Sequence, residues 1–256
     1  MRFSDEEVDR YARHLVLAEV GGPGQQKLAR ARVLIVGVGG VGGPAALYLT
    51  AAGVETLGLV DGDTVALSNL QRQILFSGAD IGRTKVEAGA ERLTALNPHV
   101  RVEAHAHALT GENAATLISR HDVVLDGTDD FDTRFLVNAA CVAAGVPLVS
   151  GALGRWSGQV GVFAGRPCYR CLVPGAPPDA ETCARVGVIG ALAGVVGSMA
   201  ALEAIKLITG AGEPLTGRLL LYDGLAATAR TVSVTADPEC PVCGNTSDAT
   251  GVHNRT

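Results

Sequence analysis

Two Cys-x-x-Cys motifs lie far apart in this sequence, at Cys168–Cys171 and Cys240–Cys243, and they constrain the fold more than any other feature. Each motif can present two thiolates to one ion, and two motifs complete a closed tetrahedral site with four sulfur ligands. We therefore expect Cys168, Cys171, Cys240 and Cys243 to bind a structural zinc ion that fastens the C-terminal region to the middle of the chain. Two redox-active pairs or an iron–sulfur cluster are the alternatives.

A glycine-rich turn, GVGGVG at residues 37–42, directly follows the apolar run Arg32–Val36. A G-x-G-x-x-G pattern between a strand and a helix is typical of nucleotide-binding turns, because its glycines permit the turn, the approach of phosphate to backbone N–H groups and close helix packing. Asp61 ends the next predicted strand, where its carboxylate can accept hydrogen bonds from ribose hydroxyls. The pattern predicts a nucleotide site; a glycine turn used only for packing is the alternative.

Short apolar segments alternate with helical patterns up to about residue 150, which predicts a Rossmann-like α/β fold with a mostly parallel sheet and helices on both faces. Beyond that point, strand-like segments at 158–163, 218–222 and 228–234 predict antiparallel additions to the sheet, with a long apolar helix at 188–208. We expect one domain over 1–256. It divides into an N-terminal helical segment (1–30), a nucleotide-binding half (31–150), a second half with the cysteine motifs (151–245) and a flexible tail (246–256).

Composition excludes several classes of function. The net charge of −5 comes with no basic stripe, which argues against nucleic-acid binding.

The N-terminus is charged and lacks the apolar core that a signal peptide has. Ser4 and Glu7 instead predict a capped helix. The uncharged stretch at 186–202 is more typical of a buried helix than of a membrane span. Charged residues make up only 18%, which indicates a large core or a subunit interface. We expect a cytoplasmic protein.

Two basic residues follow the glycine turn, Arg72 within SNLQRQ and Lys85 within GRTK. A triphosphate needs its extra charge neutralised, and attack at its α-phosphorus needs a cation beside the leaving pyrophosphate. Arg72 and Lys85 can supply that charge, although each taken alone is more simply a solvated surface residue. An NAD-dependent enzyme binds its diphosphate largely through backbone amides and has no need of them.

A cluster of carboxylates, DGTDDFDTR at 126–134, follows a short apolar strand. Carboxylate oxygens suit Mg²⁺, and we choose Asp129 as its ligand. The alternative is a helix N-cap, and Asp132 fills that role better than Asp129 does for a helix that begins near Thr133. Cys183 lies in a proline-rich stretch, where a partly exposed thiol could act as a nucleophile.

Taken together, these residues resemble the ThiF/MoeB/HesA family, the bacterial relatives of ubiquitin-activating enzymes, and within it the MoeB branch. The resemblance extends from Arg13 in RYARH to the last cysteine pair. It includes GVGGVG at 37–42, DGDTV at 61–65, SNLQRQ at 68–73, GRTK at 82–85, TDD at 128–130 and TC at 182–183. The chain departs from the family pattern at Asp130, where the family commonly has Asn.

The resemblance implies an adenylyltransferase. Its substrates would be ATP with Mg²⁺ and the C-terminal Gly-Gly carboxylate of a ubiquitin-fold sulfur carrier, MoaD-like first and ThiS-like next, bound by residues 151–245. The implied catalytic residues are Arg13, Arg72, Lys85, Asp129 and Cys183. The implied nucleotide and metal contacts are Gly37, Gly39, Gly40, Gly42, Asp61, Asp63, Ser68, Asn69, Arg72, Gln73, Lys85, Asp129 and Asp130.

The resemblance also implies a homodimer in which Arg13 reaches the partner's ATP site, and a separate protein as sulfur donor. Cys183 would link covalently to the carrier or have a secondary role. Two other functions remain open at this point: an NAD-dependent oxidoreductase, and a non-catalytic scaffold that binds a nucleotide and a ubiquitin-fold partner.

Overall fold

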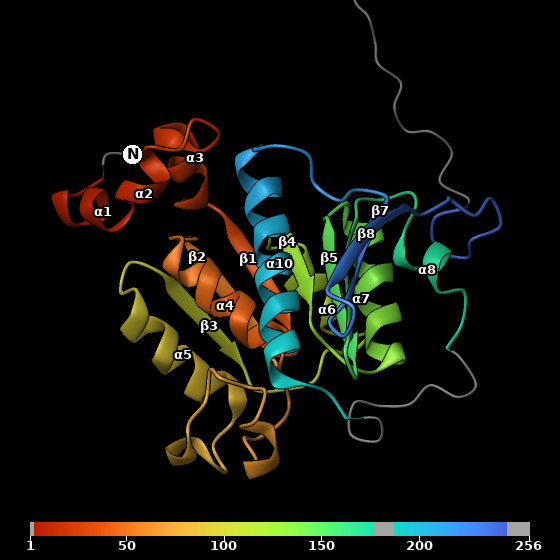
Figure 1. Cartoon of the computed structure of the whole chain (residues 1–256), viewed down its shortest axis with the longest axis horizontal. Helices are drawn as coiled ribbons and strands as arrows, with labels where there is room; N and C mark the ends of the chain where they lie inside the picture. Colours follow the sequence, from red (N-terminus) through yellow and green to blue (C-terminus); the bar gives the residue numbers. More distant parts are fainter. Residues whose placement is uncertain (1–2, 177–186, 245–256) are drawn as a thin grey trace, which may run out of the picture.

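An eight-stranded mixed sheet forms the centre of the molecule (Figure 1). The computed structural model describes residues 3–176 and 187–244. The strands are β1 (Arg32–Val36), β2 (Thr56–Val60), β3 (Arg101–His105), β4 (Val123–Asp126), β5 (Leu148–Gly154), β6 (Ser157–Phe163), β7 (Arg218–Asp223) and β8 (Thr228–Ser233). Their order in the sheet is β3-β2-β1-β4-β5-β6-β7-β8.

The first five strands are parallel, and the last three extend the sheet in antiparallel fashion, as the sequence predicts. Strands β1, β2 and β4 are almost entirely buried because both of their faces are covered. Along β1, Val33 and Ile35 join the core on one face, while Leu34 and Val36 join the core on the other. The predicted bounds of β1 are confirmed, and β2 ends directly before Asp61 as predicted.

Helices cover both faces of this sheet. They are α1 (Asp5–Arg10), α2 (Ala12–Leu15), α3 (Gly21–Leu28), α4 (Gly42–Ala51), α5 (Lys85–Leu96), α6 (Ala114–Ile118), α7 (Phe131–Ala144), α8 (Tyr169–Leu172) and α10 (Gly190–Thr209), with 3₁₀ turns η1 (Leu67–Asn69) and η2 (Gly78–Asp80). One face carries α4, α5 and α10, and the other carries α6 and α7 (Figure 1).

The helix ends follow local sequence signals. Ser4 and Glu7 form the predicted capping box at the start of α1. Gly145 ends α7 in the left-handed conformation, at φ 67°. The start of α7 differs from the prediction: the helix begins at Phe131, and Asp130 rather than Asp132 caps it, because the Asp130 carboxylate accepts a hydrogen bond from Thr133 N at 2.7 Å. Asp132 lies inside the first turn.

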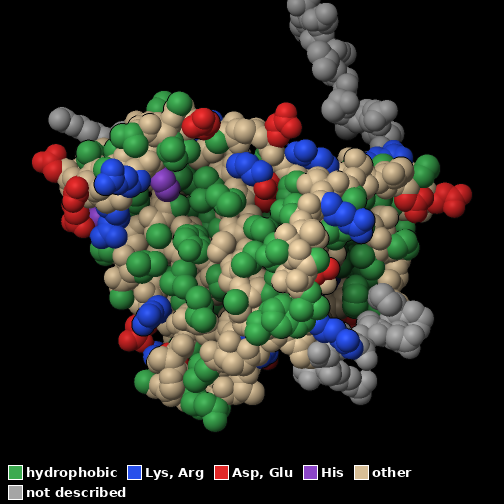
Figure 2. Space-filling model, viewed as in Figure 1, with side chains coloured by type: hydrophobic (Ala, Val, Ile, Leu, Met, Phe, Trp, Pro, Cys, Tyr) green, Lys and Arg blue, Asp and Glu red, His purple; other side chains and the backbone are tan. Residues whose placement is uncertain are grey.

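The long apolar helix α10 has the length and hydropathy of a membrane span, but it packs on α4, β5 and β6. Gly151 and Gly158 in the sheet make room for Val196, and Gly197 lies so close to Val41 O that a Cβ would be 2.4 Å away. These contacts confirm the predicted core helix. Its other side is partly open: Leu202 of α10 is 59% exposed and Tyr48 of the neighbouring α4 is 58% exposed. Figure 2 shows hydrophobic side chains gathered over both helices.

Candidate functional site

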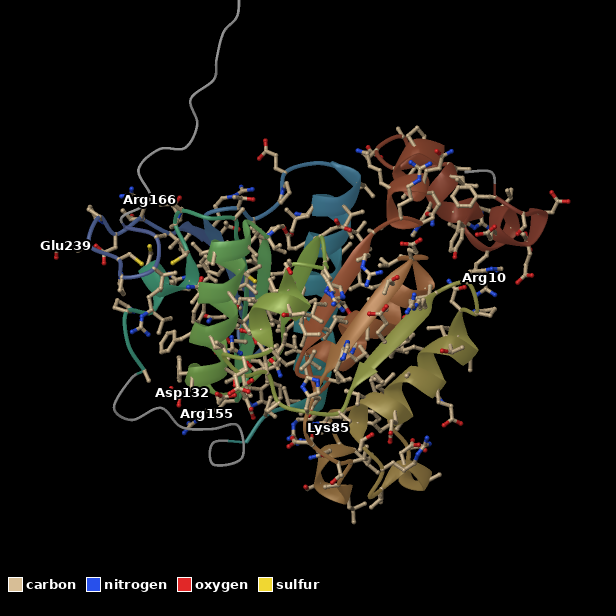
Figure 3. All side chains as sticks on the ribbon, turned by 180° about the vertical axis from the view of Figure 1, so that it is seen from behind. Arg10, Lys85, Asp132, Arg155, Arg166 and Glu239 are labelled. Atoms are coloured by element: carbon tan, nitrogen blue, oxygen red, sulfur yellow. The ribbon has the colours of Figure 1, made fainter. Side chains whose placement is uncertain are left out.

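A cavity of about 500 Å³ opens at the carboxyl ends of the parallel strands. The loops after β1, β2 and β4 border it, at the point where the chain leaves β1 for α4 on one face and β4 for α7 on the other. Open α/β sheets bind ligands at this switch in strand order. Lys85 and Asp132 lie along this edge in Figure 3, whereas Arg10 and Glu239 lie toward the opposite edge. We call this space the main cavity.

The glycine turn forms the floor of the main cavity. Gly37, Gly39 and Gly40 line it, and Gly37 has φ 82°. A Cβ on Gly37 would be 3.0 Å from Thr128, so glycine meets both the backbone and the space requirement there. Gly42 begins α4 and packs against the turn behind the lining. The backbone N–H groups and the start of α4 together suit an anionic ligand such as phosphate.

Asp61, Asp63 and Lys85 form a charged group at one wall. The Asp61 carboxylate accepts hydrogen bonds from Val38 N at 2.8 Å and from Asp63 N at 2.9 Å, which ties the end of β2 to the glycine turn. The Lys85 ammonium is only 7% exposed and lies 2.7 Å from Asp63 Oδ2 and 3.7 Å from Asp61 Oδ2. Two carboxylates therefore hold the Lys85 ammonium at the cavity wall before any ligand binds.

The SNLQRQ segment supplies the opposite wall. Asn69, Arg72 and Gln73 line the cavity, and Ser68 stands behind them, with its carbonyl accepting from Arg72 Nη1 at 3.1 Å. The start of α10 presses on this segment, because a Cβ on Gly190 would be 2.2 Å from the Gln71 carbonyl. Gln73 is buried, and its Oε1 has no hydrogen-bond partner among the described residues. An unpaired buried amide oxygen at a cavity wall suits a ligand that donates a hydrogen bond.

The loop after β4 places two carboxylates at the cavity mouth. Asp129 and Asp130 are exposed and line the cavity. Asp130 caps α7, whereas Asp129 makes no hydrogen bond within the described part of the chain and interacts with Arg134 by charge alone. Asp129 is therefore the carboxylate that is available to a cation, and its oxygen chemistry suits Mg²⁺. Asp130 accepts from Thr133 N through one carboxylate oxygen. An asparagine side chain could cap the helix in the same way.

Beneath this loop, Arg134 and Asp126 form a buried pair that the sequence analysis did not identify as part of the site. Asp126 is 1% exposed, and its Oδ2 lies 3.8 Å from Arg134 Nη1. Arg134 lines the cavity and donates to Ser150 Oγ at 3.2 Å and to Gly151 O at 3.0 Å. In the sequence, Arg134 is one arginine in a predicted helix, and nothing in the pattern around it indicates that it is buried or that it lines the cavity. Leu109, Gln159 and Tyr169 also line the cavity without having been predicted.

The four cysteines of the two motifs come together at the other end of α7. Their sulfur atoms all lie within 4.8 Å of one another, with 3.7 Å between Cys168 and Cys240 and 3.4 Å between Cys171 and Cys243. A zinc ion with four sulfur ligands at about 2.3 Å would place the sulfurs about 3.8 Å apart. Burial raises the pKa of the Cys168 thiol and therefore disfavours the thiolate. A cation bound at the cluster would have the opposite effect and stabilise the thiolate. The cluster fits zinc, and Cys141 is a separate core thiol.

Some predicted site residues do not meet the cavity. Arg13 is exposed on α2, near the amino ends of the strands, and is not part of the described lining. Gly42 and Ser68 lie behind the lining, as described above. Cys183 and the predicted flexible tail at 246–256 lie outside the described residues.

A profile of the ThiF family matches residues 11–242. The chain is 49% identical to the sulfur carrier protein adenylyltransferase of Thermus thermophilus, over 96% of this chain and 94% of that protein. It is 46% identical to the molybdopterin-synthase adenylyltransferase of Escherichia coli, over 94% and 98% of the two chains. It is 48% identical to a probable adenylyltransferase/sulfurtransferase, MoeZ, of Mycobacterium tuberculosis, of which it spans 63%.

Among solved structures, the fold is similar to that of Escherichia coli MccB in a complex with MccA-N7isoASN. The TM-score is 0.82 at 23% identity, and the alignment covers 95% of this chain and 76% of MccB. At that identity the similarity concerns the fold. The sequence matches establish more, because the family profile covers nearly the whole chain and the relatives are close to half identical. The chain belongs to the ThiF family.

Proposed function

We propose that this chain adenylates the C-terminal carboxylate of a small ubiquitin-fold sulfur-carrier protein. The observation that carries the proposal is the main cavity, where a glycine turn, two basic side chains and an exposed carboxylate meet at one sheet edge. Relatives named sulfur carrier protein adenylyltransferase and molybdopterin-synthase adenylyltransferase support it. In this reaction a carboxylate oxygen attacks the α-phosphorus of ATP, the bond to pyrophosphate breaks, and an acyl-adenylate forms.

The residues of the cavity have distinct tasks in the proposal. Backbone N–H groups of the glycine turn bind phosphate, and Asp61 accepts hydrogen bonds from ribose hydroxyls. Arg72 and Lys85 neutralise charge that develops on the leaving pyrophosphate. Lys85 is already buried and held by Asp63, so little side-chain order has to be gained when the nucleotide binds. No protein nucleophile is needed for this step.

Asp129 is the residue we assign to Mg²⁺. Its carboxylate is exposed at the cavity mouth and is not used as a helix cap, unlike that of Asp130. Mg²⁺ commonly uses one or two protein carboxylates together with phosphate oxygens, and when bound by Asp129 it would neutralise phosphate charge in the cavity. Asp130 keeps the first turn of α7 in place beside it.

The carrier is proposed to dock on the antiparallel half of the sheet. A second hollow of about 750 Å³ lies along β5 to β8, between residues such as Leu153, Gln159 and Arg230. It shares Ala152, Leu153 and Gln159 with the main cavity, so the two hollows adjoin, and we propose that the carrier's tail runs from one to the other. A surface on a rigid sheet suits a folded partner with an extended C-terminus.

A homodimer is part of the proposal because Arg13 lies away from its own cavity. The partly exposed apolar face of α4 and α10, with Tyr48 and Leu202, is a surface that a second copy would cover (Figure 2). Arg13 of one copy would then act at the cavity of the other. Mixing Arg13→Ala chains with Lys85→Ala chains should restore activity to one cavity of each mixed dimer, whereas a monomeric enzyme would show no restoration.

The four-cysteine cluster is proposed to hold zinc in a structural role, since four sulfur ligands leave no position for water. The sulfur that replaces the adenylate would come from a separate donor protein. Cys183 is proposed to have a secondary role in that transfer. A Cys183→Ala chain that adenylates normally but yields no thiocarboxylate would favour a covalent link instead.

The test is ATP–pyrophosphate exchange with Mg²⁺ and purified carriers that end in Gly-Gly. Each carrier is paired with a version that lacks its last glycine. We expect exchange with one intact carrier and its loss on truncation. Exchange at background with every carrier, despite nucleotide binding, would favour the scaffold function, and tight NAD binding that is indifferent to Arg72→Ala would favour the oxidoreductase.

A further inference from the structure

Two buried polar side chains of α7 lie between the cysteine cluster and the main cavity. The first is Asn138, which is 1% exposed. The Asn138 side chain accepts a hydrogen bond from Tyr169 N at 2.8 Å, and its Nδ2 reaches Cys168 Sγ at 3.5 Å. One side chain of α7 therefore fixes both the first cysteine ligand and the residue after it.

Arg134 lies one turn before Asn138 on the same side of α7. It is 6% exposed, and its guanidinium donates to the carbonyls of Thr128 and Gly151 and to Ser150 Oγ. Thr128 belongs to the loop after β4, and the other two acceptors belong to β5. A single planar group thus holds together two segments that border the main cavity.

The held loop is the one that ends in Asp129. Asp126 Oδ1 accepts from Thr128 N at 2.9 Å and from Thr128 Oγ1 at 2.6 Å, while Arg134 takes the Thr128 carbonyl. Both the N–H and the carbonyl of Thr128, the residue before Asp129, are therefore hydrogen-bonded. Because these partners are buried, water cannot replace them without cost, and the direction of the Asp129 side chain depends on them.

Tyr169 packs the same connection from the side. It is 2% exposed, and its ring contacts Phe163 at 5.7 Å and Phe135 at 6.2 Å between centroids. Phe135 in turn contacts Phe131, which lines the cavity, at 6.0 Å. Tyr169 and Arg134 both line the cavity as well. The aromatic contacts of Tyr169 thus lie beside the polar contacts of Asn138, between the cluster and the cavity.

We propose that Asn138 and Arg134 are positioning residues that couple the four-cysteine cluster to the Asp129 loop, so that metal loading of the cluster sets the affinity of the main cavity for Mg²⁺ and nucleotide. That Mg²⁺ and a nucleotide are the ligands of the main cavity rests on the proposed function. The coupling between the two sites rests on the contacts described above. By thermodynamic linkage, a nucleotide in the cavity would hold metal at the cluster more tightly in return.

The test uses the full-length, zinc-loaded chain with Asn138→Leu. Leucine fills a similar volume but removes both contacts to the first cysteine motif. We expect faster hydrogen–deuterium exchange at amides 127–131 and a dissociation constant for Mg²⁺ with a non-hydrolysable ATP analogue that rises about tenfold, the lower end for residues that support metal ligands. Zinc content should stay at one per chain.

Asn97→Leu is the matched control. Asn97 is fully buried and, like Asn138, uses its side chain in buried hydrogen bonds, here as the donor to Tyr11 Oη and Thr50 O. It lies at the end of α5 and makes no hydrogen bond to the cluster or to α7 in the described structure. It should lower the unfolding temperature without changing exchange at 127–131. Equal changes in the two variants would overturn the coupling, since both would then reflect general loss of stability.

Arg134→Lys keeps the proposal testable if Asn138→Leu does not fold. Lysine keeps the charge beside Asp126 but cannot reach both carbonyls, so exchange at 127–131 should rise while zinc stays bound. Unchanged exchange in that variant, or in the wild-type chain after zinc is removed by a chelator, would refute the coupling. A wild-type chain that binds no nucleotide would refute the proposed function instead, and the exchange data would still decide the coupling.

Discussion

Replacing Gly42 by alanine should damage the main cavity far more than the same change one residue later. A Cβ at Gly42 would lie 2.0 Å from Gly37 O, whereas real Cβ atoms stay at least 3.0 Å from such atoms. The turn and the start of α4 must therefore separate by 3.0 − 2.0, or about 1 Å. A Cβ at Gly43 would lie 3.3 Å from Leu75 Cβ, a contact that a shift of a few tenths of an ångström relieves.

The size of the effect follows from that displacement. A misplacement of 1 Å in a binding site can cost about 100-fold in rate, so kcat/KM for ATP in pyrophosphate exchange should fall about 100-fold for Gly42→Ala. Overpacking should also lower the free energy of unfolding by about 1–3 kcal/mol. Gly43→Ala should keep its activity, because the strain is small and alanine favours the helix.

Calorimetric titration with an ATP analogue, exchange kinetics and thermal denaturation of the two variants check this prediction. The reasoning would be refuted if Gly42→Ala matched Gly43→Ala in nucleotide affinity and in unfolding temperature. Such a result would mean that the turn can move by 1 Å without consequence, and that the close packing of Gly37 on Gly42 does not position the backbone N–H groups.

Three further predictions follow from individual side chains. Metal analysis should find one zinc per chain. Cys240→Ser should lose the zinc and become less stable, whereas Cys141→Ser should retain it. A Cys240→Ser chain that is free of zinc but as stable as the wild type would contradict the structural role. Lys85→Met should lower pyrophosphate exchange about 100-fold or more, whereas exposed Arg83→Gln should not, and equal effects of the two would count against a phosphate contact. Burial lowers the pKa of His121, with the Arg32 charge acting in the same direction, so the folded state resists a proton that the unfolded state binds. Stability should therefore fall as the pH drops below about 6.5, and a denaturant series on His121→Gln should show a flatter dependence.

Much of the fold was predictable because local signals and tertiary contacts agree. The strand before the glycine turn and the glycine that ends α7 act through near neighbours in sequence. The carboxylate at the end of β2 meets the glycine turn because β1 and β2 pair in parallel, as the alternating pattern predicts. The two cysteine motifs were predicted to meet because neither can close a four-ligand site alone. In each case the residue type itself limits the possible partners.

The missed features depend on contacts between distant segments. Asp130 and Asp132 are both adequate caps by type, and only the path of the chain out of β4 selects Asp130. Arg134 resembles any helical arginine in the sequence, yet burial against β5 gives it a carbonyl partner 17 residues away, Gly151 O. The pairing of Lys85 with Asp63 likewise spans the loop between β2 and α5 and has no periodic signal.

The most direct test of the central claim is the intact mass of a Gly-Gly carrier after incubation with this chain, ATP and Mg²⁺. We expect the wild-type chain to produce a carrier that is heavier by one adenylyl group. Less of this product should form with Lys85→Met, and none when the carrier lacks its last glycine. A carrier of unchanged mass, while the same sample consumes ATP or exchanges pyrophosphate, would contradict adenylation of the tail.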